Sequence, residues 1–426
     1  MSSGATVTPS HSLIQPLSTR LAVWVFLAFA SAYFLSALVR AVTATLAPTL
    51  SAELSLQARD LGLLAGGYFL GFAATQLPLG HWLDRYGPKR VVLVFLALAV
   101  LGCIAFAQAS SFTGLLAARV LTGAGVSACL MAPLTGYRRW LPQSMQLRAN
   151  AWMLMTGSMG MVASTLPVQW LMPMVGWRGL FWLLAAAFIL TMLLITWLSP
   201  PWQHNDSAPL SDKGTEKAKD QGGYGQIWRH PYFRKMSPVG FFNYGGMVAV
   251  QTLWAGPWLV KVSGLTPAQA ASGLFGINLA MLCAFWLWGV VTPGLSRRGV
   301  RVESLIAWGL PMSFLALAWN VASGESTSWM HWAWFCVSST FLGLSQPAVA
   351  MAFPASMAGR ALSAYNLVIF AGVFVMQWAI GLMIDLWGAF GWTEAQAFRG
   401  AMGTFLIVCL LSYGYFLSVK AHNRPS

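Results

Sequence analysis

The chain has 426 residues, of which 57% are hydrophobic and only 8% are charged. Soluble domains carry about 25% charged residues, so this composition excludes an ordinary soluble protein and indicates that lipid surrounds most of the chain. The net charge of +14 does not indicate a nucleic-acid partner, because the bases lie in short loops between apolar stretches and form no single polar face.

Twelve apolar stretches follow one another along the chain, each close to the 20 residues or so that a helix needs to cross a bilayer. In lipid every backbone polar group must be paired internally, which leaves helices and closed barrels. The stretches lack the apolar–polar alternation of barrel strands, so we predict an all-α membrane protein in contact with the lipid bilayer. The predicted spans are 21–48, 61–82, 91–109, 112–136, 150–171, 179–198, 237–260, 268–292, 303–322, 331–352, 362–385 and 398–419.

A polar, glycine-rich stretch separates the first six spans from the last six. It contains HNDSAPLSDKGTEKAKDQGG, a composition typical of a flexible cytoplasmic linker. The first residues lack the basic start of a signal peptide, so the first apolar stretch is predicted to remain as a span. The predicted parts are a tail (1–20), a six-helix bundle (21–198), the central loop (199–235), a second six-helix bundle (236–419) and a tail (420–426).

The basic residues are distributed unevenly between the two sides of the membrane. With both termini on one side, that side holds 19 of the 25 Lys and Arg residues. Cytoplasmic loops are enriched in these residues. We therefore predict a multi-pass protein of a bacterial inner (plasma) membrane with both termini in the cytoplasm.

Three matches at one offset of 212 residues indicate an internal duplication. One match could arise by chance, but three at equivalent places in the topology favour two related halves, an architecture known among transporters. The matches are Arg85-x-Gly87 with Arg297-x-Gly299, Arg148 with Arg360, and Gly160 with Gly372.

The loop after the second span, GHWLDRYGPKR, concentrates charge in a chain that has little. Gly80 allows another helix to approach closely, and Gly87 allows a left-handed turn. Asp84 can lie against the positive N-terminal end of a neighbouring helix, a contribution of roughly 0.3–2 kcal/mol. A plain topology anchor explains the bases of this loop, which are Arg85, Lys89 and Arg90, but it does not explain the acid.

The pattern Gly80-x-x-x-Asp84-Arg85-x-Gly87-x-Lys89-Arg90, placed between the second and third of twelve spans, resembles the signature loop of the major facilitator superfamily. The resemblance covers about residues 20–420, and RVLTGAGVSA, from Arg119, is similar to the fourth-span motif of that family. GSMGMVASTLP (157–167) loosely resembles the fifth-span motif of antiporters but lacks its Gly-Pro pair.

This resemblance implies twelve helices in two pseudo-symmetric six-helix bundles and secondary transport by alternating access. It also implies that Asp84 lies against the start of the eleventh span, near Ala361, as a latch that holds the cytoplasmic side shut. The second copy of the loop has Ser296 and Thr292 where the first has Asp84 and Gly80, so its latch is expected to be weaker.

Arg40 is the leading candidate for substrate binding, because it is the only charge between Leu21 and Leu50. A buried charge is costly and is a functional hypothesis by default, and a guanidinium suits a carboxylate, phosphate or sulfonate. The alternative is an arginine that extends to the outer headgroups. Other polar or aromatic residues within spans could complete a pocket or could simply pack; the chosen ones are Tyr33, Gln251, Trp254, Asn278, Tyr365 and Gln377, from a wider set that includes Tyr68 and Tyr244.

Three residues are candidates for coupling, with protons as the candidate ion. The family resemblance implies this role for Arg119, and the alternative is a structural hydrogen bond to a neighbouring carbonyl. His331 is its partner at the 212 offset and has a structural alternative. Asp385 is the acid closest to a span interior, although the count from Arg360 places it near the outer surface.

We therefore interpret the chain as a secondary transporter, expected to be a monomer, that carries a small anionic organic solute. Two arginines within spans and no clearly central acid favour an anion. The alternative is a proton-driven efflux antiporter of drugs or metabolites. An enzyme is disfavoured, because the histidines are scattered and no nucleophile, zinc or nucleotide motif is present; the five cysteines lie in apolar stretches without metal-ligand spacing, so no metal or cofactor is expected.

Overall fold

The computed structural model describes residues 17–200, 202 and 224–419. Within these ranges the regular structure is helical and contains no strand. Residues 1–16 of the predicted first tail, the predicted second tail and most of the predicted central loop lie outside the described residues. Each of the twelve predicted spans coincides with helical residues, so the prediction of an all-α membrane fold is confirmed.

The first six spans are formed by α1 to α7. A backbone break separates α2 from α3 at Thr75 and α4 from α5 at Ser127, and the Thr75 hydroxyl donates to the Ser127 hydroxyl at 2.7 Å. Gly87 and Gly176 turn the chain inside α3 and α7 at φ +78° and +64°. The helices are α1 (Thr19–Leu54), α2 (Ala58–Ala74), α3 (Gln76–Gln108), α4 (Phe112–Val126), α5 (Ala128–Trp140), α6 (Gln143–Ala163) and α7 (Leu166–Leu198).

Among the last six spans, the seventh and tenth are divided into shorter pieces. Two stretches of the seventh span, η1 and η2, are π-helical, and η3 and η4 are 3₁₀-helical. The pieces are α9 (Tyr224–Arg229), α10 (Pro231–Pro238), η1 (Val239–Tyr244), α11 (Gly245–Ala249), η2 (Val250–Trp254), α12 (Ala255–Lys261), α13 (Pro267–Arg297), α14 (Val302–Ser323), η3 (Gly324–Ser326), α15 (Trp329–Ser338), η4 (Thr340–Leu344), α16 (Ser345–Met351), α17 (Ala355–Ala389) and α18 (Glu394–Ser418).

Among the described residues, eight helices are long and apolar enough to cross a membrane alone. The other four predicted spans, the second, fifth, seventh and tenth, each run across a break between two or more helices. Hydropathy averages over a whole span, which explains why it finds these four spans but not the breaks within them.

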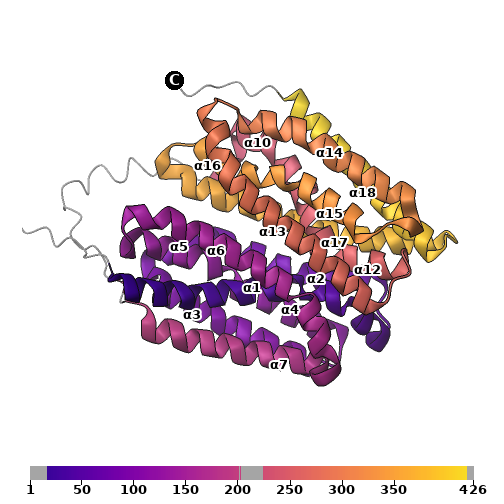
Figure 1. Cartoon of the computed structure of the whole chain (residues 1–426), viewed down its shortest axis with the longest axis horizontal. Helices are drawn as coiled ribbons and strands as arrows, with labels where there is room; N and C mark the ends of the chain where they lie inside the picture. Colours follow the sequence, from indigo (N-terminus) through magenta and orange to yellow (C-terminus); the bar gives the residue numbers. More distant parts are fainter. Residues whose placement is uncertain (1–16, 201, 203–223, 420–426) are drawn as a thin grey trace, which may run out of the picture.

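The two halves of the chain form two groups of helices, α1–α7 and α9–α18, which lie beside each other in Figure 1. Equivalent glycines pack alike in both: Gly160 of α6 lies against the carbonyl of Phe34, and Gly372 of α17 lies against the carbonyl of Phe241. A side chain at either glycine would overlap that carbonyl. Gly299 repeats the left-handed turn of Gly87 at φ +72°. These contacts support the duplication that the sequence predicts.

We name the two ends of the bundle by their landmarks. The motif face carries the loop of residues 80–90 and the start of α17. The pocket face carries the end of α1, the start of α2 and the ends of α12 and α17, which together line a cavity described below. In Figure 1, α5 and α16 lie toward the motif face and α12 lies toward the pocket face.

Candidate functional site

Arg40 lies near the middle of a helix that is longer than the bilayer is thick. α1 has 36 residues and is therefore about 54 Å long, whereas the hydrocarbon core measures about 30 Å. The 14 residues from Arg40 to the end of α1 span about 21 Å. This depth favours a role in the bundle interior over an arginine that extends to headgroups.

The Arg40 guanidinium lies among three tyrosines that come from both halves of the protein. Tyr33 and Tyr68 of the first half and Tyr244 of the second half all lie close enough to interact with it electrostatically. Its Cζ lies 5.8 Å from the centre of the Phe72 ring, and its Nε has no hydrogen-bond partner among the described residues. Arg40 and Tyr244 are both partly exposed, so this charged group lies deep in the bundle and yet remains reachable.

Arg119 is a close neighbour with a different environment. Its side chain is fully buried, its Nη1 donates to the Val39 carbonyl at 3.1 Å, and its Cζ lies 5.2 Å from the centre of the Tyr68 ring. Its Nε and Nη2 find no partner within the described parts of the chain. Tyr68 therefore lies beside both arginines, while its hydroxyl donates to the Ser36 carbonyl at 3.2 Å.

A glycine of the fourth-span motif sets this geometry. A Cβ at Gly123 would overlap the Tyr68 carbonyl, so α4 and α2 approach here to backbone contact. Arg119 is one turn earlier on the same helix, and its side chain is thereby held against α1 and α2. The motif glycine explains why Arg119 reaches Tyr68 and the Val39 carbonyl.

The predicted amide residues of the second half form hydrogen-bonded pairs. Gln251 donates to Asn278 at 3.0 Å, and Gln377 donates to the Thr252 hydroxyl at 2.9 Å. The Gln377 Oε1 atom is buried and has no partner among the described residues. Gln251 and Thr252 lie in η2, and π-helical turns of this kind are frequent at functional sites.

Two predicted binding residues hydrogen-bond within the second half, away from Arg40. Trp254 is fully buried, and its indole N–H donates to the Gln377 carbonyl at 3.1 Å. Tyr365 is also fully buried and donates to the Met236 carbonyl at 3.2 Å, near the motif face. The structure therefore brings Tyr33 to Arg40 but places Tyr365 at the junction of α10 and η1.

His331 and Asp385, which the sequence singled out for coupling, both bind helix N-termini at the pocket face. The Nδ1 of His331 accepts the backbone N–H of Ser328 at 3.0 Å and so caps its own helix, α15. The Asp385 carboxylate accepts the backbone N–H groups of Ala58 and Arg59, at 3.1 and 3.0 Å, at the start of α2. Its partners are more than 300 residues away in the sequence, and the sequence pattern alone did not identify them.

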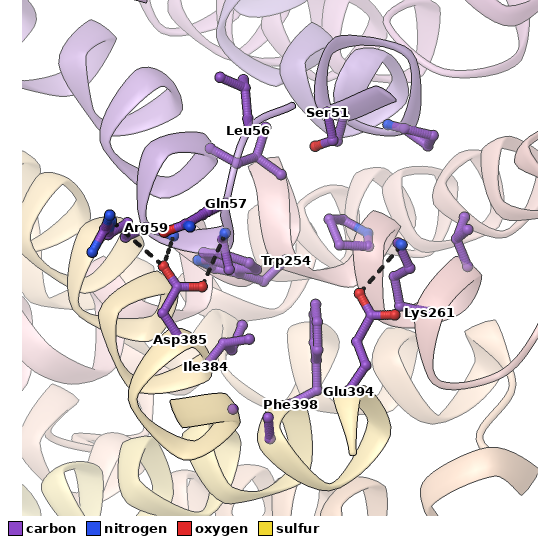
Figure 2. Close-up of a pocket in the computed structure, with 18 of the residues that line it drawn as sticks. Ser51, Leu56, Gln57, Arg59, Trp254, Lys261, Ile384, Asp385, Glu394 and Phe398 are labelled. Atoms are coloured by element: carbon purple, nitrogen blue, oxygen red, sulfur yellow. Dashed lines mark hydrogen bonds and ion pairs between the residues drawn. The ribbon is translucent and has the colours of Figure 1, made fainter. Parts of the chain in front are cut away.

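A cavity of about 1030 Å³ opens at the pocket face between the two halves. Figure 2 shows its lining, which includes Ser51 and Leu56 of the first half and Trp254, Ile384 and Phe398 of the second. Its volume is at the upper end of the usual range for ligand pockets. Its four labelled charges are, however, paired within the wall: Arg59 with Asp385 at 3.9 Å, and Lys261 with Glu394 at 3.2 Å. The cavity therefore offers no free charge comparable to Arg40.

The loop at the motif face has one well-defined anchor. Lys89 donates to the carbonyls of Thr196 and Ser199, at 2.7 and 3.1 Å, and thereby binds the end of α7. A cation at a helix C-terminus is favourable. Arg85 and Arg90 are exposed, and Arg85 lies over the Tyr86 ring at 5.4 Å. Lys89 therefore holds the loop to α7 within the first half.

The other side of this loop is uncovered. Asp84 is exposed and makes no hydrogen bond or ion pair with any described residue. Gly80, one turn earlier, faces open space, since a Cβ at this position would meet no atom of another described residue within 4 Å. The expected close approach of a helix at Gly80 is therefore wrong for this structure, because no described helix packs against this face of α3.

Comparison with known proteins agrees with this architecture. A family model described as Major Facilitator Superfamily matches residues 29–350. The cis,cis-muconate transport protein of Acinetobacter baylyi is 23% identical over 327 residues, which cover 75% of this chain and 77% of that protein. A probable sulfoacetate transporter of Cupriavidus necator is 24% identical over 253 residues, or 56% of this chain and 57% of the relative.

Among solved structures, the fold resembles a bacterial homologue of the human lysosomal transporter Spinster in an inward-facing and occupied conformation. The TM-score is 0.75 at 18% identity, with 94% of this chain and 97% of that chain covered. At this identity the similarity establishes the fold alone.

Proposed function

Because the chain belongs to the Major Facilitator Superfamily, and the relatives named above are transporters, we propose that it moves a small organic anion across the membrane by alternating access. The observation that carries this proposal is Arg40, a partly exposed guanidinium deep in the bundle, beside Tyr33, Tyr68 and Tyr244. A guanidinium binds carboxylate and sulfonate groups through two parallel hydrogen bonds. Two similar proteins are named for the transport of organic anions, muconate and sulfoacetate.

The distribution of acids supports an anionic substrate. Every carboxylate in the described ranges lies at or near a helix end or turn and none lies beside Arg40, so a bound anion would supply the missing countercharge. The same distribution disfavours the alternative of a proton-driven efflux antiporter for cations. The carboxylates of the described ranges are Glu53, Asp60, Asp84, Glu303, Glu325, Asp385 and Glu394.

The remaining polar groups suggest how the substrate is held. We assign the anionic group to Arg40 and its tyrosines, and the uncharged part of the solute to the amides of Gln251, Asn278 and Gln377. Trp254 and Tyr365 are assigned packing roles because their polar atoms already bind carbonyls of the second half. Such a site is concave and mostly apolar, with few polar groups that fix orientation.

Arg119 is proposed as a coupling residue, because it lies against the Tyr68 ring. A substrate bound to Arg40 would shift Tyr68 and thereby change the surroundings of Arg119. His331 and Asp385 cap helices at the pocket face and lie apart from Arg40. We further propose that the motif face is the cytoplasmic side of the inner membrane, since the basic loops lie on that side.

The test is a thermal-unfolding screen of the purified full-length protein. The probes are cis,cis-muconate and sulfoacetate as anions, a neutral sugar, and tetraphenylphosphonium as a lipophilic cation. A ligand at 100 times its dissociation constant stabilises a protein by about 2.7 kcal/mol. We expect an anion to stabilise the wild type and Arg148→Gln, a charge-matched control at an exposed position, but not Arg40→Gln.

Equal stabilisation of Arg40→Gln by the same anion would contradict the assignment of Arg40. Stabilisation by the lipophilic cation alone, in all three proteins, would contradict the anion proposal and favour the exporter.

A further inference from the structure

The carboxylate of Asp385 joins the two halves of the protein at the pocket face. Its Oδ1 accepts the Ala58 N–H at 3.1 Å and its Oδ2 accepts the Arg59 N–H at 3.0 Å, as Figure 2 shows. These are the first two N–H groups of α2, which have no partner within their own helix. Asp385 belongs to α17 of the second half, so one carboxylate caps a helix of the other half and neutralises its positive end.

The backbones of α2 and α17 are shaped for this contact. A side chain at Gly381 would overlap the Ala58 carbonyl, and a side chain at Gly62 would overlap the Gln377 carbonyl. Both helices therefore carry a glycine one turn from the cap, on the facing surface. The Asp385 cap is thus part of a close-packed seam and not a chance contact of a flexible side chain.

The same two spans carry a second acid at the opposite end. The second span continues from α2 into α3 and ends at Asp84, which is near the motif face, as is the start of α17. Asp84 is exposed and unpaired among the described residues, and Gly80 beside it is uncovered. Each span of the pair therefore has a carboxylate near its C-terminal end, and only the one at the pocket face is engaged.

We propose that Asp385 is the latch of the pocket face, and that it alternates with Asp84 as the halves rock. In the present state Asp385 caps α2 and Asp84 is free; in the opposite state Asp385 releases α2 and Asp84 engages the start of α17. A rigid pair of helices that tilts about its middle closes one end as it opens the other, so the two contacts exclude each other. This inference rests on the alternating-access function proposed above.

A nearby ion pair provides a matched control. Glu394 and Lys261 lie on the same face and line the same cavity, 3.2 Å apart. They join the start of α18 to the end of α12, both within the second half. Loss of this pair removes a carboxylate from the same cavity without breaking a contact between halves.

The test is a distance measurement by double electron–electron resonance across the pocket face. Spin labels go on Ser110, between α3 and α4, and Ser326, before α15; both are exposed and lie in different halves. The native cysteines are replaced by serine so that only these positions are labelled. Distances are measured in the wild type and in Asp84→Asn, which weakens the opposite latch and so enriches the state with the pocket face closed.

We expect Asp385→Asn to shift molecules from the short distance between the two labels, with the pocket face closed, to the long distance, with this face open. The ratio of the two populations should change by about two- to thirtyfold, the range for one charge at a helix terminus. Asparagine preserves the shape of the side chain, so the protein should fold normally. Glu394→Gln should leave the distribution unchanged. In the Asp84→Asn background the Asp385→Asn shift should remain visible.

An unchanged distribution in Asp385→Asn, in both backgrounds, would overturn the proposal, as would an equal shift in Glu394→Gln. The measurement needs no substrate. An unchanged distance distribution would therefore leave the anion proposal intact. Equal stabilisation of Arg40→Gln in the thermal-unfolding screen would leave the Asp385 proposal intact.

Discussion

Replacement of Arg119 by methionine separates a coupling role from a structural one. Methionine is shorter than arginine but keeps an unbranched apolar stem, and it has no polar group that needs a partner. The change removes one hydrogen bond, from Nη1 to the Val39 carbonyl, and one contact with the Tyr68 ring. It also removes two buried N–H positions, Nε and Nη2, that have no partner among the described residues.

The magnitudes nearly cancel. A hydrogen bond from a charged donor contributes about 1.5–3 kcal/mol, and a cation–π contact contributes about 0.5–2 kcal/mol. Each unsatisfied buried donor costs about 1–3 kcal/mol, so the two together offset these contributions. The Val39 carbonyl keeps its bond within α1, and no carboxylate is left unpaired, so the 3–5 kcal/mol or so that follows disruption of a buried ion pair does not apply.

We therefore expect the free energy of unfolding of Arg119→Met to lie within about 2 kcal/mol of the wild-type value. We also expect uptake of the anion that stabilises the wild type to fall at least about tenfold, within the usual range of a coupling free energy. The assays are thermal unfolding in detergent and uptake into vesicles, with Arg148→Met as the control at an exposed position. A loss of stability of about 3–5 kcal/mol with uptake largely retained would refute the reasoning, since Arg119 would then be an anchor of α4.

Two further substitutions test the contacts of Tyr68 and of Lys89. Tyr68→Phe removes the hydroxyl that donates to the Ser36 carbonyl and that interacts with Arg40. We expect titration calorimetry to show anion affinity lower by about ten- to 150-fold, the range for one hydrogen bond to a charged group; unchanged affinity would exclude Tyr68 from the site. Lys89→Met removes two bonds to the end of α7, and we expect a loss of about 1–3 kcal/mol in thermal unfolding, whereas Arg90→Met, at an exposed position of the same loop, should change little.

The sequence predicted the spans correctly because each is a long apolar stretch, and lipid imposes that pattern whatever the tertiary contacts are. It predicted the duplication for a similar reason: Gly160 and Gly372 each meet a carbonyl, which leaves no room for any other residue. The left-handed turns at Gly87 and Gly299 were likewise predictable from local chemistry.

The features that the sequence did not predict depend on residues far away in the chain or on the conformation in which the protein is seen. The depth of Arg40 follows from the length of α1, which extends beyond its apolar stretch. The place of Tyr365 depends on α10, and hydropathy carries no information on which helix a tyrosine faces. Gly80 was expected to meet another helix, and no described residue packs against it. The duplication gave no signal for the Asp385 contact, because it pairs Asp84 with Ser296 and α17 with α6, and the position equivalent to Asp385 is Pro173.

The seam between α2 and α17 connects the proposed latch to the proposed site. From the pocket face it runs through Gly62 against Gln377 and Gly66 against Phe374, and it ends where the rings of Phe72 and Phe370 lie 4.4 Å apart. Phe72 is also the ring beside the Arg40 guanidinium. A solute bound to Arg40 would therefore touch the last contact of the seam whose first contact is the Asp385 cap. Coupling between two sites requires an element with two arrangements that both sites bias. Under the rocking motion proposed above, this helix pair is such an element, and it carries no charged residue between its ends.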